Sequence, residues 1–149
     1  MSQKIWQIYL SGEIHSDWRE RIITGARERN LPVSFSSAVT DHDASDMVGV
    51  NILGQEEDPF WRDRKASGIN SIRTSTSIRL ADLVVVRFGP KYKQWNAAFD
   101  AGFAVASGKP IITLHDAEHD HALKEVDEAA KATCRHPEQV VEILSYLVS

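Results

Sequence analysis

Apolar residues along this chain follow two spacings, one typical of buried strands and one typical of amphipathic helices. Short β-rich apolar runs occupy residues 5–10, 33–39, 82–88, 110–115 and 132–135. Between these runs, apolar residues recur every three or four positions, as Trp18, Ile22 and Ala26 do. Strands that alternate with helices in this way are typical of a parallel sheet covered by helices. The pattern therefore predicts a three-layer α/β/α sandwich, Rossmann- or flavodoxin-like, with about five parallel strands.

The predicted helices are signalled by their ends and by their inward faces. Residues 94–107 are expected to form a helix of small residues that Gly108 ends, and Pro137 fits the first position of the last helix. Ser16 is expected to cap the first helix, and residues 119–131 are expected to form a polar helix. A further helix is expected over residues 68–80, with its inward positions at Ile69, Ile72, Thr76 and Leu80.

Residues 41–65 show no sustained period and are rich in Asp, Glu, Gly and aromatic residues. A structureless stretch of that length is uncommon inside a compact domain, so we expect a functional excursion or lid here. Its apolar members are more than an exposed loop normally carries. We therefore also expect a homodimer or higher homo-oligomer, with this segment near the interface.

The composition fits one globular domain over residues 1–149. The chain is 42% hydrophobic and 26% charged, which excludes general disorder. No apolar run approaches the ~20 residues of a membrane span, and the N-terminal apolar stretch is not followed by a signal-peptide cleavage site. A single cysteine, Cys134, excludes an internal disulfide framework and a cysteine-based zinc site. We expect a soluble cytoplasmic protein that binds neither a membrane nor a nucleic-acid polymer.

The distribution of charge is uneven. The net charge is −4, which argues against a general nucleic-acid coat protein. Between Trp61 and Lys93, however, eight basic residues stand against two acidic ones. This local excess marks either a site for a small anion or two solvated helix faces and a loop.

Ligands of open parallel sheets bind beyond the carboxyl ends of the strands. That rule selects residues 11–15, 40–43, 89–96 and 115–121. The dinucleotide-binding fingerprint, the Walker A loop, the nucleophile elbow and the His-Glu-x-x-His motif are all absent from the sequence. On the helix after the valine-rich strand, Lys93, Asn96 and Asp100 share one face. Asp100 is either a nucleophile, an acceptor for sugar hydroxyls or a solvated helix acid.

Two groups of acidic residues and histidines raise the question of a metal. The groups are Asp41, His42, Asp43 and Asp46, and His115, Asp116, His119 and His121. Neither group has a recognised ligand spacing, so we expect no metal and no cofactor. Hydrogen bonding to a sugar or base is their alternative use. Among the tryptophans, Trp6 and Trp18 are expected in the core, and Trp61 and Trp95 are expected to flank the pocket and to stack on a base.

Several blocks of the sequence resemble the nucleoside 2-deoxyribosyltransferase superfamily. They are Ile8-Tyr9-Leu10-Ser11-Gly12, Ala81 to Val86, Asn96 to Ala104 and Gly108 to Ile112. The likeness is strongest to the YtoQ branch of that superfamily, whose pattern Thr-Asp-His-x-x-Ser-Asp is similar to residues 40–46. Residues 91–96, Lys-Tyr-Lys-Gln-Trp-Asn, also resemble this branch. The branch resemblance covers essentially the whole chain.

This resemblance implies a covalent glycosyl-enzyme chemistry. In such relatives a Glu on this helix attacks the sugar, a tyrosine of the first strand orients it, and an acid lies six residues before it. The corresponding residues here are Asp100, Tyr9 and Gln94. Two of the three positions therefore depart from the pattern, which implies either a different substrate or a pocket that has lost its chemistry.

The leading hypothesis is cleavage or transfer of the N-glycosidic bond of a nucleoside or nucleotide-like small molecule. A non-catalytic nucleotide-sensing module and a metal-dependent hydrolase are the alternatives. Under the leading hypothesis, Asp100 and Tyr9 are the catalytic residues. The residues expected to bind substrate are Ser11, Gly12, Glu13, Asp41, His42, Gly89, Lys93, Gln94, Trp95 and Asn96.

Overall fold

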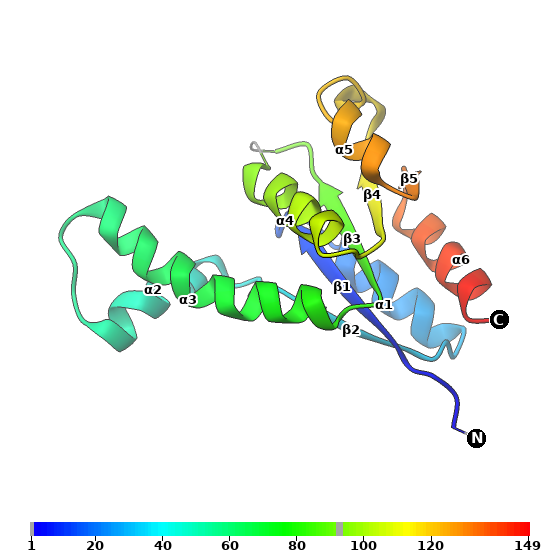
Figure 1. Ribbon diagram of the computed structural model, residues 1–149, viewed down its shortest axis with the longest axis horizontal. Coiled ribbons are helices and arrows are strands. Elements are labelled where there is room, and N and C mark those ends of the chain that lie inside the picture. Colours follow the sequence, from blue (N-terminus) through cyan, green and yellow to red (C-terminus); the bar gives the residue numbers. More distant parts are fainter. Residues whose placement is uncertain (1, 92–93) are drawn as a thin grey trace.

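The computed structural model describes residues 2–91 and 94–149, and its described strands form one parallel sheet (Figure 1). The order of the strands is β2-β1-β3-β4-β5. Neighbouring strands pair in parallel throughout, which confirms the predicted α/β fold with a parallel sheet. The strands are β1 (Trp6–Gly12), β2 (Val33–Ser37), β3 (Leu83–Phe88), β4 (Ile111–His115) and β5 (Ala132–Cys134).

Helices cover both faces of this sheet. On one face, α1 (Trp18–Glu28) and α6 (Pro137–Leu147) pack against β1, β3 and β4. The other face is covered by α3 (Pro59–Leu80), α4 (Trp95–Ala106) and α5 (Lys124–Ala129). A further helix, α2 (His42–Leu53), lies against α3, and a short 3-10 turn spans Ala117–His119.

Alternation along the strands explains the two cores. In β1, Ile8 and Leu10 point to the side of α1 and α6, where they meet Trp18 and Ile22. Tyr9 points to the opposite side, toward α3 and α4. Because β1 lies inside the sheet and is covered on both faces, Ile8, Tyr9 and Leu10 are all buried, whereas Trp6 at its start is partly buried.

The α2–α3 hairpin corrects the prediction of a structureless excursion over residues 41–65. Asp41 caps α2 by accepting from the Ala44 amide at 3.1 Å, and Asp58 caps α3 by accepting from the Phe60 amide at 2.9 Å. The two helices pack mainly against each other and extend beyond the sheet (Figure 1). Few of their residues are buried, so the sequence here lacks the wide apolar stripe of a core-facing helix.

Three further local predictions differ from the structure. In α3, Ile72 and Leu80 are 68% and 71% exposed, and Ala66 and Ile78 are buried instead. The cap position of α1 is Asp17, since the Ser16 hydroxyl donates to the Glu13 carboxylate. The helix expected over residues 119–131 is shortened to α5 after the 3-10 turn. None of the described helices is long and apolar enough to cross a membrane.

Candidate active site

A cavity of about 800 Å³ lies between α4 and the α2–α3 hairpin. Asn96 and Asp100 line it from α4, one helical turn apart, together with the rings of Phe99 and Phe103. This volume lies within the range of small-molecule sites. The structure thus brings together two of the three residues expected on one face of this helix, whereas the third, Lys93, lies outside the described residues.

The Asp100 carboxylate is held by the end of strand β1. The Ser11 hydroxyl donates to Asp100 Oδ2 at 2.7 Å. Burial raises the pKa of the Asp100 carboxyl above its ordinary value, and the hydrogen bond from Ser11 opposes that rise. Ser11 is itself almost fully buried. The pairing fixes one carboxylate oxygen of a residue that lines the cavity.

Tyr9 lies on the same side of β1, two residues before Ser11. Its hydroxyl is buried and has no partner in hydrogen-bonding geometry among the described residues. Burial raises the pKa of the Tyr9 phenol, the nearby Thr74 side chain opposes the rise, and the charge of Asp100 adds to it. Asp100 therefore receives its hydrogen bond from Ser11, where the resemblance implied Tyr9.

The turn after β1 is built for close packing. Gly12 has φ = +120°, and a Cβ there would lie 2.1 Å from the Arg87 carbonyl oxygen. The buried Glu13 carboxylate accepts from the His15 and Ser16 amides at 2.6 and 3.2 Å. A Cβ on Gly89 would lie 2.6 Å from Glu13 Cγ. Three residues expected to bind substrate, Gly12, Glu13 and Gly89, are thus absent from the lining of the cavity and shape the turn that presents Ser11.

Arg19 completes this turn and was missed by the sequence patterns. It is 8% exposed, and its guanidinium donates to the carbonyls of Leu10, Gly12 and Glu13 at 3.3, 3.1 and 2.6 Å. Burial lowers the pKa of Arg19 from its ordinary value. A helix residue next to Trp18 gave no signal of this role, because the carbonyls that it binds come from β1 and the turn.

The pattern over residues 40–46 places three of its members, His42, Ser45 and Asp46, in the lining of the cavity. His42 and Asp46 are one turn apart on α2, with His42 Nε2 3.1 Å from Asp46 Oδ2, and both line the cavity. Ser45 is fixed to α3, because the Asn70 amide donates to its carbonyl and to its hydroxyl, each at 3.1 Å. Asp41 serves as the helix cap. The pattern Thr-Asp-His-x-x-Ser-Asp therefore describes a capped helix turn that carries a His–Asp pair.

One wall of the cavity was not predicted. Small polar residues of α3 line it at helical spacing, and a search for polar rather than apolar periodicity would have found them. They are Ser67, Asn70, Ser71, Thr74 and Ser75.

The residues that begin α4 take other positions. Gln94 occupies the cap position of α4 and its side-chain amide donates to the Lys91 carbonyl at 3.0 Å. Trp95 is 70% exposed and Trp61 is 51% exposed, and neither lines the cavity. The expectation that these two tryptophans flank the pocket is therefore wrong for this cavity. Trp18 packs in the core as predicted, and Trp6 packs against this core but is only partly buried.

The charge of the cavity favours solvated helix faces over an anion site as the explanation of the described basic residues between Trp61 and Lys93. Its described lining carries three carboxylates, Asp46, Asp63 and Asp100, and neither Lys nor Arg. Arg87, from the basic stretch, lies with its Nε 3.9 Å from Glu13 Oε1, in the turn after β1. The basic residues that the structure describes thus lie outside this cavity, where a phosphate would meet negative charge.

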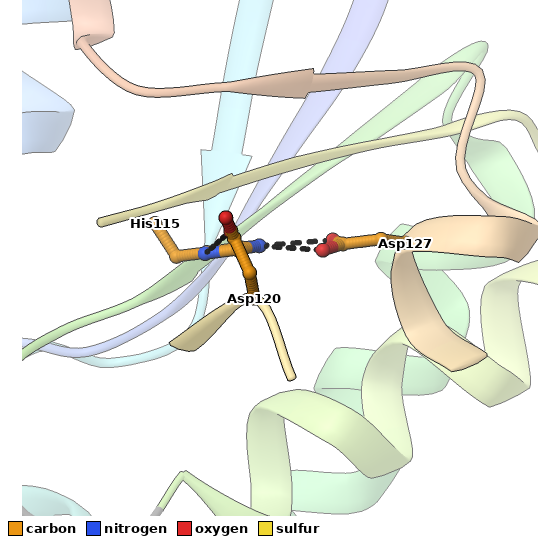
Figure 2. A group of neighbouring side chains, drawn as sticks. All are labelled: His115, Asp120 and Asp127. Atoms are coloured by element: carbon orange, nitrogen blue, oxygen red, sulfur yellow. Dashed lines mark hydrogen bonds and ion pairs between the residues drawn. The ribbon is translucent and has the colours of Figure 1, made fainter. Parts of the chain in front are cut away.

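A second polar cluster, away from the cavity, joins His115, Asp120 and Asp127 (Figure 2). Their nearest ligand atoms lie within 4.8 Å of one another, so these are the described residues that could hold a metal ion. The groups already bind one another and their neighbours. His115 Nε2 lies 2.8 Å from Asp127 Oδ2, and its Nδ1 lies 2.8 Å from the Asp116 carbonyl.

Further donors complete this cluster. Arg135 binds both oxygens of Asp120 at 2.6 and 3.0 Å, and the Thr113 hydroxyl donates to Asp127 at 2.7 Å. The result is a hydrogen-bonded network that ties the end of β4 to α5 and to the residues after β5. An ion would have to displace these bonds, so the network fits a structural role better than a metal site.

Comparisons with known proteins match the sequence of this chain to a family. The family profile described as "Nucleoside 2-deoxyribosyltransferase YtoQ" matches residues 9–148. The YtoQ protein of Bacillus subtilis (strain 168) is 43% identical over 140 residues, which cover 94% of this chain and 95% of that protein.

Two solved structures share the fold. A conserved protein from Enterococcus faecalis V583 is 14% identical, with a TM-score of 0.63 and coverage of 97% of this chain and 99% of that one. A 2-deoxyribosyltransferase from the psychrotolerant bacterium Bacillus psychrosaccharolyticus is 16% identical, with a TM-score of 0.53 and coverage of 91% and 90%. At these identities the likeness extends to the fold alone.

Proposed function

Because the chain belongs to the nucleoside 2-deoxyribosyltransferase YtoQ family, we propose that it cleaves or transfers the N-glycosidic bond of a nucleoside, with Asp100 as the nucleophile. The observation that carries this proposal is the hydrogen bond from buried Ser11 to Asp100 at the wall of the cavity. A solvated helix acid would need neither the burial nor the partner.

The proposed reaction has two steps. In the first, the oxygen of Asp100 that Ser11 does not hold attacks the anomeric carbon, and the bond from that carbon to the base nitrogen breaks. The electron pair of the broken bond stays on the base. In the second step, water or another base attacks the same carbon, and the Asp100 carboxylate is released.

The mechanism requires the Asp100 carboxylate to come close to the anomeric carbon of the sugar. Asp is one methylene shorter than the Glu that the resemblance implies, so its carboxylate lies about 1.5 Å further back. Attack requires the reacting atoms to come within ~3–3.5 Å. The sugar must therefore bind correspondingly deeper, against Asn96 and the hydroxyls of α3, which supply hydrogen-bond partners for a sugar.

The charge of the cavity favours a nucleoside over a nucleotide. A 5′-phosphate would approach three carboxylates without a described basic partner. A neutral base, in contrast, has the exposed ring of Phe99 on which to stack. We propose a small-molecule nucleoside as the ligand and the cytoplasm as the location.

A sensing module that binds a nucleoside without turnover is the second candidate. The specific observations that favour it are the short side chain of Asp100 and the engagement of Gln94 with the Lys91 carbonyl, where the relatives carry an acid. A metal-dependent hydrolase has less support, since it would leave the Ser11–Asp100 pair unused.

A screen of purified protein tests the proposal. Ribonucleosides, 2′-deoxynucleosides, their 5′-monophosphates and divalent metals are compared by thermal shift, because a ligand of the folded state raises Tm by mass action. Each compound is also incubated with protein, with and without a second free base, and analysed by chromatography. Released or exchanged base from nucleosides supports the enzyme, binding without turnover supports the sensor, and a response to metals alone contradicts both.

A further inference from the structure

The His42–Asp46 pair faces the cavity from the wall opposite α4. Both residues line the same space as Asp100, although they come from the α2–α3 hairpin. Asp41 caps the helix at this turn, and Asn70 binds Ser45 between the two. The turn is thus held at its start and in its middle, while the pair itself stays accessible, with His42 70% and Asp46 57% exposed.

The pairing with Asp46 determines which ring nitrogen of His42 can exchange a proton with a bound molecule. Nε2 faces the Asp46 carboxylate at 3.1 Å, so Nδ1 is the nitrogen that remains to exchange a proton with a bound molecule. A carboxylate on one nitrogen fixes the orientation and the tautomer of the ring. The other charged groups that line the cavity are Asp63 and Asp100.

Breaking an N-glycosidic bond requires a proton for the departing base. The helix that carries Asp100 offers none at Gln94, whose amide is engaged with Lys91. Resting on the function proposed above, we infer that His42 is the general acid for the leaving base and that Asp46 positions it. As the bond to the base breaks and its electron pair moves into the base, His42 Nδ1 gives its proton to another ring nitrogen, N7 in a purine. The base therefore leaves as a neutral molecule, and His42 becomes neutral.

The second step uses the same residue in reverse. Neutral His42 takes a proton from the incoming water or base as it attacks the anomeric carbon. The ring then carries two protons again, and Asp100 leaves as a carboxylate. Protons and electrons balance over the cycle, and no further co-reactant is required.

The test compares bases that need a proton with bases that do not. Guanosine and 2′-deoxyguanosine are measured next to their N7-methylated forms, whose cationic base leaves as a neutral molecule. His42→Gln and Asp46→Asn are compared with wild type and with Asp43→Asn, a matched change on the same helix at a residue that does not line the cavity. Circular dichroism and Tm establish that each variant is folded.

We expect His42→Gln to lower the single-turnover rate of base release, which reports the first step alone, by about a hundredfold or more on the unmethylated nucleosides and by no more than about threefold on the methylated ones. Asp46→Asn should show the same selectivity with a smaller loss, and Asp43→Asn should behave as wild type. Equal losses on both kinds of substrate, or none on either, would overturn the inference while leaving Asp100 as nucleophile. A wild-type protein that cleaves none of the four compounds contradicts the proposed function, and the inference falls with it.

Discussion

At the scale of single residues, Asp100 is the group on which the site depends. Burial raises the pKa of its carboxyl, so the ionised form is less favourable in the folded protein than in the unfolded chain. When the pKa of an acid is higher in the folded than in the unfolded state, this cost is absent at a pH below the unfolded pKa of about 4. It is complete at a pH above the folded pKa. The carboxylate therefore lowers stability at neutral pH, as expected of a group kept for chemistry.

The first prediction follows from this unfavourable contribution of the Asp100 carboxylate to stability at neutral pH. Asp100→Asn should raise Tm at pH 7, since the amide oxygen still accepts from Ser11 without the cost of a buried charge. The difference between variant and wild type should shrink as the pH falls and vanish below about pH 4. Thermal unfolding from pH 3 to pH 8 measures it. A variant less stable than wild type at neutral pH would show that the charge is stabilised by its surroundings.

The second prediction separates attack from binding. If Asp100 attacks the sugar, Asp100→Asn should abolish base release while nucleoside binding stays nearly intact, because the amide keeps the shape but is not nucleophilic. If Asp100 only accepts sugar hydroxyls, the same change should weaken binding by ~1–3 kcal/mol. Calorimetric titration and chromatography distinguish the two. Full turnover by the Asn variant would exclude Asp100 as nucleophile.

At the scale of elements, the α2–α3 hairpin decides the shape of the cavity. The two helices approach closely at Gly49, where a Cβ would lie 2.5 Å from Lys65 Cβ and 2.6 Å from the Ala66 amide. Gly68 is also helical, in α3, but a Cβ there would meet nothing within 4 Å. The two glycines therefore form a matched pair, one required by packing and one not.

The third prediction uses this pair. Gly49→Ala should lower the free energy of unfolding by about 1–3 kcal/mol and weaken nucleoside binding, because α2 must move away from α3. Gly68→Ala should raise the free energy of unfolding by about 0.5–1 kcal/mol through its better helix propensity. Urea unfolding measures both. Equal behaviour of the two variants would contradict the close contact of the helices.

At the scale of the whole molecule, the tip of the hairpin carries four exposed apolar side chains. Ile52, Leu53, Phe60 and Trp61 are 67%, 59%, 64% and 51% exposed, and the rings of Phe60 and Trp61 pack edge to face. Exposing this many neighbouring apolar side chains to water is energetically unfavourable, so such a surface is typical of an interaction site. This surface supports the proposal that the protein assembles with a second copy of itself through residues 41–65.

The fourth prediction concerns that assembly. Light scattering at micromolar concentration should give at least the mass of a dimer, and Phe60→Asp should shift the mass toward that of a monomer. Tyr146→Asp is the control, since Tyr146 is 80% exposed on α6, outside the hairpin. A monomeric wild type, or an equal shift by the control, would exclude the hairpin tip as the interface.

Much of the sheet could be predicted from the sequence because its signals are local. The strands β1, β3 and β4 are continuous apolar runs, since they are covered on both faces. The helix α4 could also be predicted from its small residues, because Ala97, Ala101 and Ala104 pack directly on the sheet. Helical spacing along the sequence also predicted that Asp100 lies on this helix and shares a face with Asn96.

The sequence by itself thus determined the order of the strands along the chain, the helices between them apart from α2 and the start of α3, and the face of α4 that carries Asp100. Only the tertiary structure decided that the α2–α3 hairpin closes the cavity, since its helices bury little apolar surface and leave a weak periodic signal. It also decided that Ser11, rather than Tyr9, holds Asp100, a contact between residues 89 positions apart. Hydrogen bonds across such separations follow from strand register and helix packing, which no local spacing of residues encodes.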